Sequence, residues 1–162
     1  MSRRAGRIGH VGAAVLAAVV GLFVCAGTAV SGGGLSTGQT IYLPVYSHIY
    51  YGIKSRPFNL TVTVSVRNTD MKRPLTVLSA DYYDTDGRLV RHFLDKPETL
   101  PPLGTREFII DERDEAGGSG ANCIVRWSSP GPMNPPVVES VMIGASSNQG
   151  ISFLSVGRVI GE

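Results

Sequence analysis

The side chains best suited to chemistry are concentrated in residues 111–120, which read DERDEAGGSG. This stretch holds four carboxylates beside a glycine-rich segment: Asp111, Glu112, Asp114 and Glu115. Hard cations such as Ca²⁺ take about six to eight oxygen ligands, which carboxylates and loop carbonyls can supply. The stretch is therefore a candidate site for Ca²⁺, another divalent cation or a small ligand. The alternative is a solvated acidic loop whose charge is partly offset by Arg113.

Residues 84–87, DTDG, have the spacing with which a calcium loop begins. The later ligands and the distal glutamate of such a loop are missing from the sequence that follows. An Asp-Gly pair between two apolar stretches is typical of a β-hairpin. We therefore predict a hairpin turn at this position.

Two histidines and one cysteine offer softer ligands: His48, His92 and Cys123. Together with nearby carboxylates they could assemble a zinc or copper site. No two of them have the spacing of ligands on one element, so such a site would depend on the fold. The alternative is that both histidines are ordinary strand or loop residues. Cys123 alternates with Val125 and Trp127, which predicts an inert buried thiol.

A nucleophile is suggested only by Ser119, in a stretch close to the Gly-x-Ser-x-Gly elbow of hydrolases. That elbow needs a strand before the serine and a helix after it, and neither is visible in the sequence. His48 and His92 are the only histidines after residue 31 that could act as a base. We find no catalytic constellation and no cofactor fingerprint, so we predict that the protein is not an enzyme.

Four closely spaced tyrosines suggest binding instead of catalysis: Tyr42, Tyr46, Tyr50 and Tyr51. A tyrosine combines a large apolar ring with a polar tip, which suits a binding surface. Along a strand, however, alternation would turn two of the four toward the core. The group is thus a candidate partner-binding patch and, on the other interpretation, a set of ordinary core and surface aromatics.

Short strands are the elements that must position these residues. Residues 58–67 alternate strictly between apolar and polar side chains, which predicts a half-buried strand. Other predicted strands are residues 40–46, 75–83, 89–94, 106–111, 122–128, 137–143 and 151–160. Separators rich in Gly, Pro, Asp and Asn predict turns at residues 68–70, 84–87, 100–104, 116–120 and 129–132.

No amphipathic helical stretch follows Gly38. The sequence therefore predicts an all-β fold, an antiparallel β-sandwich of about seven to eight strands with an immunoglobulin- or fibronectin-like arrangement. Cys123 is the only cysteine after residue 31, so the domain has no internal disulfide. Its stability must come from burial.

The N-terminal stretch predicts export. Residues 1–10 contain three arginines and no acid, and residues 11–30 contain no charged residue. This is the layout of a secretory leader, and roughly 20 apolar residues also suffice to span a bilayer. We predict that residues 1–31 form a signal peptide or a retained helical membrane anchor, with lipidation at Cys25 as a further alternative. The positive end stays in the cytoplasm, so the domain would lie in the periplasm or on the outer face of the cytoplasmic membrane.

Residues 32–38 are predicted to be a flexible glycine-rich linker and residues 39–162 the β-sandwich domain. Three of the 15 basic residues precede residue 31, which leaves 12 against 13 acidic residues and a net charge of about −1. A nearly neutral domain offers no electrostatic reason to expect a nucleic-acid partner.

Several segments together carry a family resemblance: residues 38–47, 67–69, 81–84, 103–108 and 114–122. On these segments, residues 41–160 resemble a bacterial family of exported proteins classed as a domain of unknown function, numbered 3124. The resemblance implies a leader or lipid anchor, one small domain and no assigned activity.

These observations favour a non-enzymatic binding or interaction module of the cell envelope. Its expected partner is another envelope protein, and the membrane is a second partner if the N-terminal segment is retained. The alternative is a binder of metal or of a small ligand that uses the acidic loop, and the third reading is a hydrolase.

Overall fold

In the computed structural model, residues 34–146 and 149–162 are described, and these residues form twelve strands and no helix. The strands are β1 (Ser36–Pro44), β2 (His48–Tyr51), β3 (Arg56–Asn59), β4 (Thr61–Arg67), β5 (Leu75–Tyr83), β6 (Leu89–His92), β7 (Glu98–Leu100), β8 (Thr105–Ile110), β9 (Asn122–Met133), β10 (Val137–Ser146), β11 (Gln149–Val156) and β12 (Arg158–Gly161). A helix suited to crossing a bilayer is not found among the described residues. The predicted leader or anchor, residues 1–31, lies outside them, as does Cys25.

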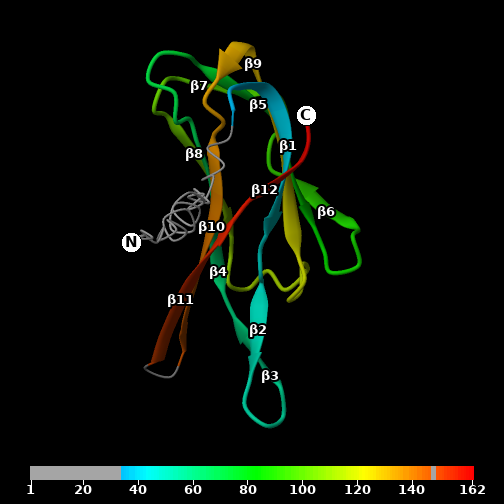
Figure 1. Cartoon of the computed structure of the whole chain (residues 1–162). Coiled ribbons are helices and arrows are strands. Elements are labelled where there is room, and N and C mark those ends of the chain that lie inside the picture. The colour runs from blue at the N-terminus through cyan, green and yellow to red at the C-terminus, as the bar shows by residue number, and fades with distance from the viewer. Residues whose placement is uncertain (1–33, 147–148) are drawn as a thin grey trace, which may run out of the picture. The chain divides into compact units, whose positions relative to one another are not determined.

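The strands form three antiparallel sheets (Figure 1). The largest sheet has the order β12-β1-β9-β5-β6, and β7 also pairs with β5. A four-stranded sheet has the order β11-β10-β4-β8, while β2 and β3 pair only with each other. The all-β, antiparallel prediction is confirmed, and the two larger sheets fit a β-sandwich. The narrower immunoglobulin- or fibronectin-like arrangement stays a prediction.

The core lies between the inner faces of the two larger sheets. Every second side chain points inside from Leu60, just before β4, through Val62, Val64 and Val66 on β4, and all four of these apolar residues are fully buried. On β9 of the other sheet, Cys123, Val125 and Trp127 share the buried face, as the sequence predicts. Alternation along each strand thus supplies one apolar face to each layer of the sandwich.

There are more strands than the predicted seven to eight because backbone contacts divide two long apolar stretches. The backbone N–H of Leu60 donates to the carbonyl of Ser47 at 2.9 Å, which separates β3 from β4. The N–H of Gly157 donates to the carbonyl of Val138 at 2.8 Å, where the chain passes from β11 in one sheet to β12 in the other. The short strands β2 and β7 carry too little periodicity to be predicted.

Two predicted loops are strand instead. Residues 36–38, assigned to the linker, belong to β1. Gly38 is needed there for close packing, because a Cβ atom at this position would lie 2.8 Å from the carbonyl oxygen of Trp127. Residues 129–132, predicted as a turn, lie within β9. Gly38 pairs with Ser128 and Ser36 with Met133, so the prolines lie in a bulge, where a strand tolerates them.

Buried polar groups connect the loops at the C-terminal end of β4. The side-chain amide of Asn68 donates to the carbonyls of Arg73 and Pro101, both at 2.9 Å. The carboxylate of Asp70 accepts the backbone N–H groups of Lys72 and Arg73 at 2.8 and 3.0 Å. These two backbone hydrogen bonds are the main cause that lowers the pKa of Asp70 below its ordinary value of 3.8.

The lowered pKa predicts an acid-sensitive contribution to stability. The folded state binds the Asp70 proton more weakly than the unfolded chain, so the stabilisation is complete above pH 3.8 and is lost as the pH falls through the folded-state pKa. We expect Asp70→Asn to lower the free energy of unfolding at neutral pH and to flatten its decline below pH 3.8. Urea unfolding at a series of pH values measures both effects. Asp95→Asn, at an exposed position, is the control, and an equal flattening in that variant would contradict the assignment.

Candidate functional site

Three segments that are distant in the sequence meet at the N-terminal end of β4. They are the β2–β3 hairpin, the turn between β5 and β6, and the loop of residues 111–121 between β8 and β9. The turn was predicted from the sequence as a hairpin turn, and the loop holds the acidic residues that were candidates for a cation site. Hydrogen bonds join all three segments into one site.

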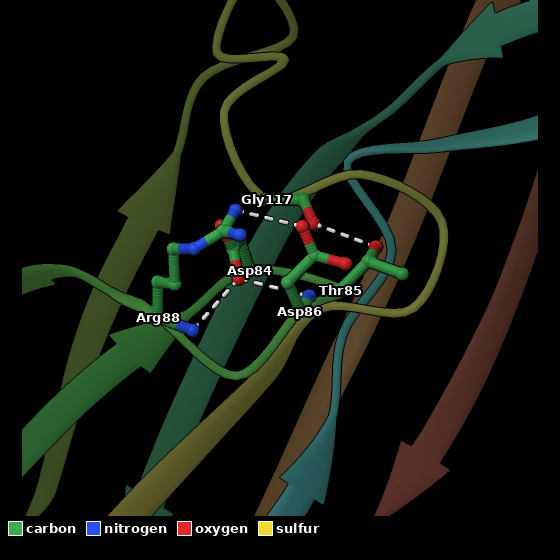
Figure 2. Close-up of polar contacts among 5 residues, drawn as sticks. All are labelled: Asp84, Thr85, Asp86, Arg88 and Gly117. Carbon is green, nitrogen blue, oxygen red and sulfur yellow. Dashed lines mark hydrogen bonds and ion pairs between the residues drawn. The ribbon is translucent and has the colours of Figure 1, made fainter.

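Asp84 organises the turn between β5 and β6 (Figure 2). Its Oδ1 accepts the backbone N–H groups of Asp86 and Arg88 at 2.9 and 2.8 Å. Gly87 has a φ of 77°, a left-handed conformation that glycine adopts without strain. The guanidinium of Arg88 pairs with Asp86 at 2.7 Å. The predicted hairpin turn is confirmed, and its carboxylates are used within the turn.

Thr85 joins this turn to the glycine-rich loop. Its backbone N–H donates to the carbonyl of Gly117 at 2.9 Å, and its hydroxyl donates to the same carbonyl at 3.0 Å, as Figure 2 shows for the hydroxyl. The hydroxyl oxygen in turn accepts the N–H of Gly120 at 3.0 Å. The loop therefore follows the turn closely enough that side chains at Gly118 and Gly120 would press on Thr85.

The same loop holds the root of the β2–β3 hairpin. Gly118, with a φ of 79°, presents its carbonyl to both the backbone N–H and the hydroxyl of Ser47, each at 3.1 Å. The side-chain amide of Asn59 donates to Glu115 at 2.8 Å. Because Ser47 precedes the hairpin and Asn59 ends it, both of its strands are attached to the loop.

Two of the four acidic side chains of the loop accept hydrogen bonds from its own backbone. Asp111 accepts the N–H of Arg113 at 2.9 Å, and Asp114 accepts the N–H of Ala116 at 3.2 Å. Asp114 also pairs with Arg91 at 3.3 Å, Glu115 binds Asn59, and Glu112 is exposed. Within residues 34–146 and 149–162, no three His, Cys, Asp or Glu side chains are grouped so that they could hold a metal ion.

The candidate softer ligands are not brought together. His48 lies on β2, where its Nε2 is 3.2 Å from the hydroxyl of Tyr50. His92 lies on β6, with Nδ1 2.6 Å from the buried carboxylate of Asp81, which also pairs with Arg126 at 3.0 Å. Ser119, the candidate nucleophile, lies in the loop before β9.

The four tyrosines divide into two pairs. Tyr42 and Tyr46 are half-buried on and just after β1, and the ring of Tyr46 meets Phe153 edge-on at 5.7 Å. Tyr50 and Tyr51 lie on the hairpin and are 57% and 53% exposed. The candidate patch is therefore reduced to its last two members.

The sequence did not point to three further exposed side chains at the end of the β2–β3 hairpin. Ile53 is fully exposed at the turn, and Lys54 and Arg56 beside it are exposed too. We call Tyr50, Tyr51, Ile53, Lys54 and Arg56 the hairpin tip. Gly52 beside two tyrosines was the available turn signal, because glycine favours the positive φ of 70° that it has here.

Beneath the loop, Tyr82 and Cys123 are buried. Burial is the main cause that raises the pKa of each to about 12, and the charge of Asp114 adds to the shift at Tyr82. The Tyr82 hydroxyl has no hydrogen-bond partner among the described residues and lies against Gly117. Both groups act as packing elements, as predicted for Cys123.

A family model described as "Protein of unknown function (DUF3124)" matches residues 38–160. The chain belongs to this family. The match begins inside β1 and ends inside β12, so the DUF3124 domain contains the hairpin, the turn and the loop that form the site. The resemblance to the domain of unknown function numbered 3124 is thus confirmed, while the bacterial and exported character of the family stays a prediction.

Among solved structures, the crystal structure of Thermotoga maritima 1070 is similar to this DUF3124 member. The two share 10% sequence identity with a TM-score of 0.47, over 76% of this chain and 96% of that one. None of the curated proteins compared with the chain matches it.

Because Gly117 packs closely on Tyr82, we predict that one methyl group added at residue 117 strongly destabilises the fold. We expect Gly117→Ala to lower the free energy of unfolding by about 1–3 kcal/mol, because the new Cβ would overlap the Tyr82 hydroxyl and ring. Gly131→Ala is the matched control: nothing lies within 4 Å of its added Cβ, and its effect should stay within about 0.5 kcal/mol. Equal unfolding midpoints for the two variants in urea would refute the contact.

The raised pKa predicts that Cys123 resists thiol reagents. With Cys25→Ser, Cys123 is the only thiol in the full chain. At about pH 8 a thiol with this pKa is ionised in roughly one molecule in 10,000, and the thiolate is the reactive species. We expect maleimide labelling of the folded protein to be far slower than labelling in urea. Equal rates in both conditions would show that the thiol is accessible.

Proposed function

We propose that the chain is an exported, non-enzymatic binding module of the bacterial cell envelope that holds its partner with the hairpin tip. One observation carries the proposal. Three large apolar side chains, Tyr50, Tyr51 and Ile53, are exposed together on one narrow hairpin. Single exposed apolar residues are ordinary, but a group of them on one element is typical of an interaction site.

The aromatic rings of the hairpin are held in place before any partner arrives. His48 and Tyr50 meet edge-on with their ring centres 5.1 Å apart, and Tyr51 meets Phe58 in the same way at 6.0 Å. Rings that are already ordered lose less conformational freedom on binding, which favours affinity. Tyrosine is also enriched among residues that dominate binding energy.

The hairpin root supports this role because it is fixed to the sandwich. Ser47 and Asn59 bind the glycine-rich loop, as described above. Phe58 packs against Gly144 of β10, where any side chain would collide with the ring. The structure thus combines a firmly attached base with an exposed tip, and Figure 1 shows the hairpin extending away from the paired strands of both larger sheets.

Export is the part of the proposal that rests on the N-terminal sequence. A basic start followed by 20 uncharged residues directs a chain out of the cytoplasm, whether or not the segment is later removed. The partner is therefore expected in the periplasm or at the outer face of the cytoplasmic membrane.

The test is capture of the partner by a variant without the two rings. We expect the double variant Tyr50→Ala/Tyr51→Ala to keep its fold and to lose about 2 kcal/mol of binding energy, roughly 30-fold in affinity. Crosslinking of the tagged full-length protein in its native envelope, followed by mass spectrometry, measures capture.

Met71→Ala provides the matched control. Met71 is also a large exposed apolar residue, but it lies in the loop at the opposite end of β4. This variant should capture as well as the unchanged protein. Normal capture by the folded double tyrosine variant would show that the hairpin does not hold a protein partner.

A further inference from the structure

The hairpin tip combines apolar and positively charged side chains without any acidic residue. Lys54 follows Ile53, Arg56 follows Ser55, and both basic side chains are exposed. The first acidic residue anywhere in the chain is Asp70. The ion pairs formed by the described residues include neither Lys54 nor Arg56. Both charges are therefore available to a partner.

This positive charge is a local property. Residues 32–162 carry 12 basic and 13 acidic side chains, so the domain as a whole is slightly negative. Glu115 is held at the hairpin root by Asn59, at the end of β3 that is farthest from the turn. The tip thus presents a small cationic surface on a domain whose net charge is slightly negative.

The shape of the tip is convex. The N–H of Ser55 donates to the carbonyl of Gly52 at 3.2 Å and closes the turn, and Gly52 and Ser55 both have positive φ. Ile53 and Lys54 lie between them at the end of the hairpin, with Tyr50 and Tyr51 on the strand that leads to it. A partner must therefore accommodate the protruding Ile53 side chain together with the tyrosine rings and positive charges beside it.

We propose that this hairpin tip binds the surface of an anionic phospholipid bilayer and inserts Ile53 into its interfacial region. Tyrosine rings are favoured at the level of the lipid headgroups. Lysine and arginine can bury their aliphatic stems while their charges reach the phosphates. An isoleucine at the very end then enters the acyl boundary. The inference rests on the proposed binding role of the hairpin and names its partner.

A bilayer fits these observations better than a protein pocket does. A bilayer interface accepts a convex apolar point and supplies negative charge on all sides of it, which suits Lys54 in the turn and Arg56 directly after it. A protein partner would need a dedicated acidic pocket of matching shape. Binding to such a pocket is the competing outcome that the experiment must separate.

The experiment places an environment-sensitive fluorophore beside the tip of the full-length chain. Ser55→Cys in a Cys25→Ser background carries the label and leaves Ile53, Lys54 and Arg56 in place. The protein is reconstituted in vesicles of phosphatidylcholine, either alone or with phosphatidylglycerol in equal parts. Nitroxide-labelled lipids then quench a fluorophore that enters the bilayer. A label at Met71→Cys, at the other end of β4, reports any contact caused by the N-terminal segment alone.

We expect strong quenching at position 55 in the vesicles that contain phosphatidylglycerol, and several-fold less in phosphatidylcholine alone or at position 71. Lys54→Gln/Arg56→Gln should lower the equilibrium constant for insertion by roughly 30-fold, at the usual contribution of a basic residue near an anionic surface. Ile53→Ser should reduce quenching while circular dichroism stays unchanged.

Three results would overturn the inference: no quenching at position 55 in either vesicle, equal quenching in both vesicle types, or equal quenching at positions 55 and 71.

The proposed function is judged separately. If Tyr50→Ala/Tyr51→Ala loses capture of an envelope protein while position 55 never meets lipid, the hairpin is a binding element but its partner is a protein. If neither capture nor quenching depends on the tip, both proposals fail.

Discussion

Burial of alternating apolar side chains between two sheets is the constraint on which the rest of this structure depends. The domain has one cysteine and so has no disulfide to limit its unfolded state. Its stability must come from faces such as that of β4, where Leu60, Val62, Val64 and Val66 are all fully buried opposite Trp127 and its neighbours on β9. Once these faces are inside, the polar segments that join the strands are left at the two ends of β4. One end is closed by Asn68 and Asp70, and the other carries the candidate site.

The loop of residues 111–121 shows how the fold changes the meaning of a sequence pattern. Four carboxylates beside glycines predict a cation site as readily as they predict a turn. In the structure, the carboxylates mostly accept hydrogen bonds from nearby backbone and side-chain groups or pair with Arg91. The glycines allow Gly117 to lie on Tyr82 and Gly118 to present its carbonyl to Ser47. The loop acts as a brace between the β5–β6 turn and the hairpin root.

The hairpin places its large side chains in two different environments. Phe58, near its root, packs on Gly144 and helps to attach it, while Tyr50, Tyr51 and Ile53 face water. Exposed apolar groups contribute little to folding, so their presence together at the tip is the observation on which the proposed binding role rests. Lys54 and Arg56 add positive charge to this same tip, and the first acidic residue, Asp70, comes later in the chain. Hydrophobic contact and electrostatic attraction would therefore act on one partner at one place.

The sequence by itself determined which strands have strong period-two patterning. It predicted β5 with its observed bounds, the buried face of β9 and the turn at Asp84, because alternation and turn chemistry are local properties. Only the tertiary structure decided that residues 58–67 divide at Leu60, that Gly38 belongs to a strand, and that the tyrosines separate into half-buried and exposed pairs. It also decided that Ser47, Thr85 and Gly118 belong to one site. These outcomes depend on hydrogen bonds and close contacts between segments far apart in the chain, such as Ser47 and Gly118, which are 71 residues apart, and no local pattern of residue types encodes such contacts.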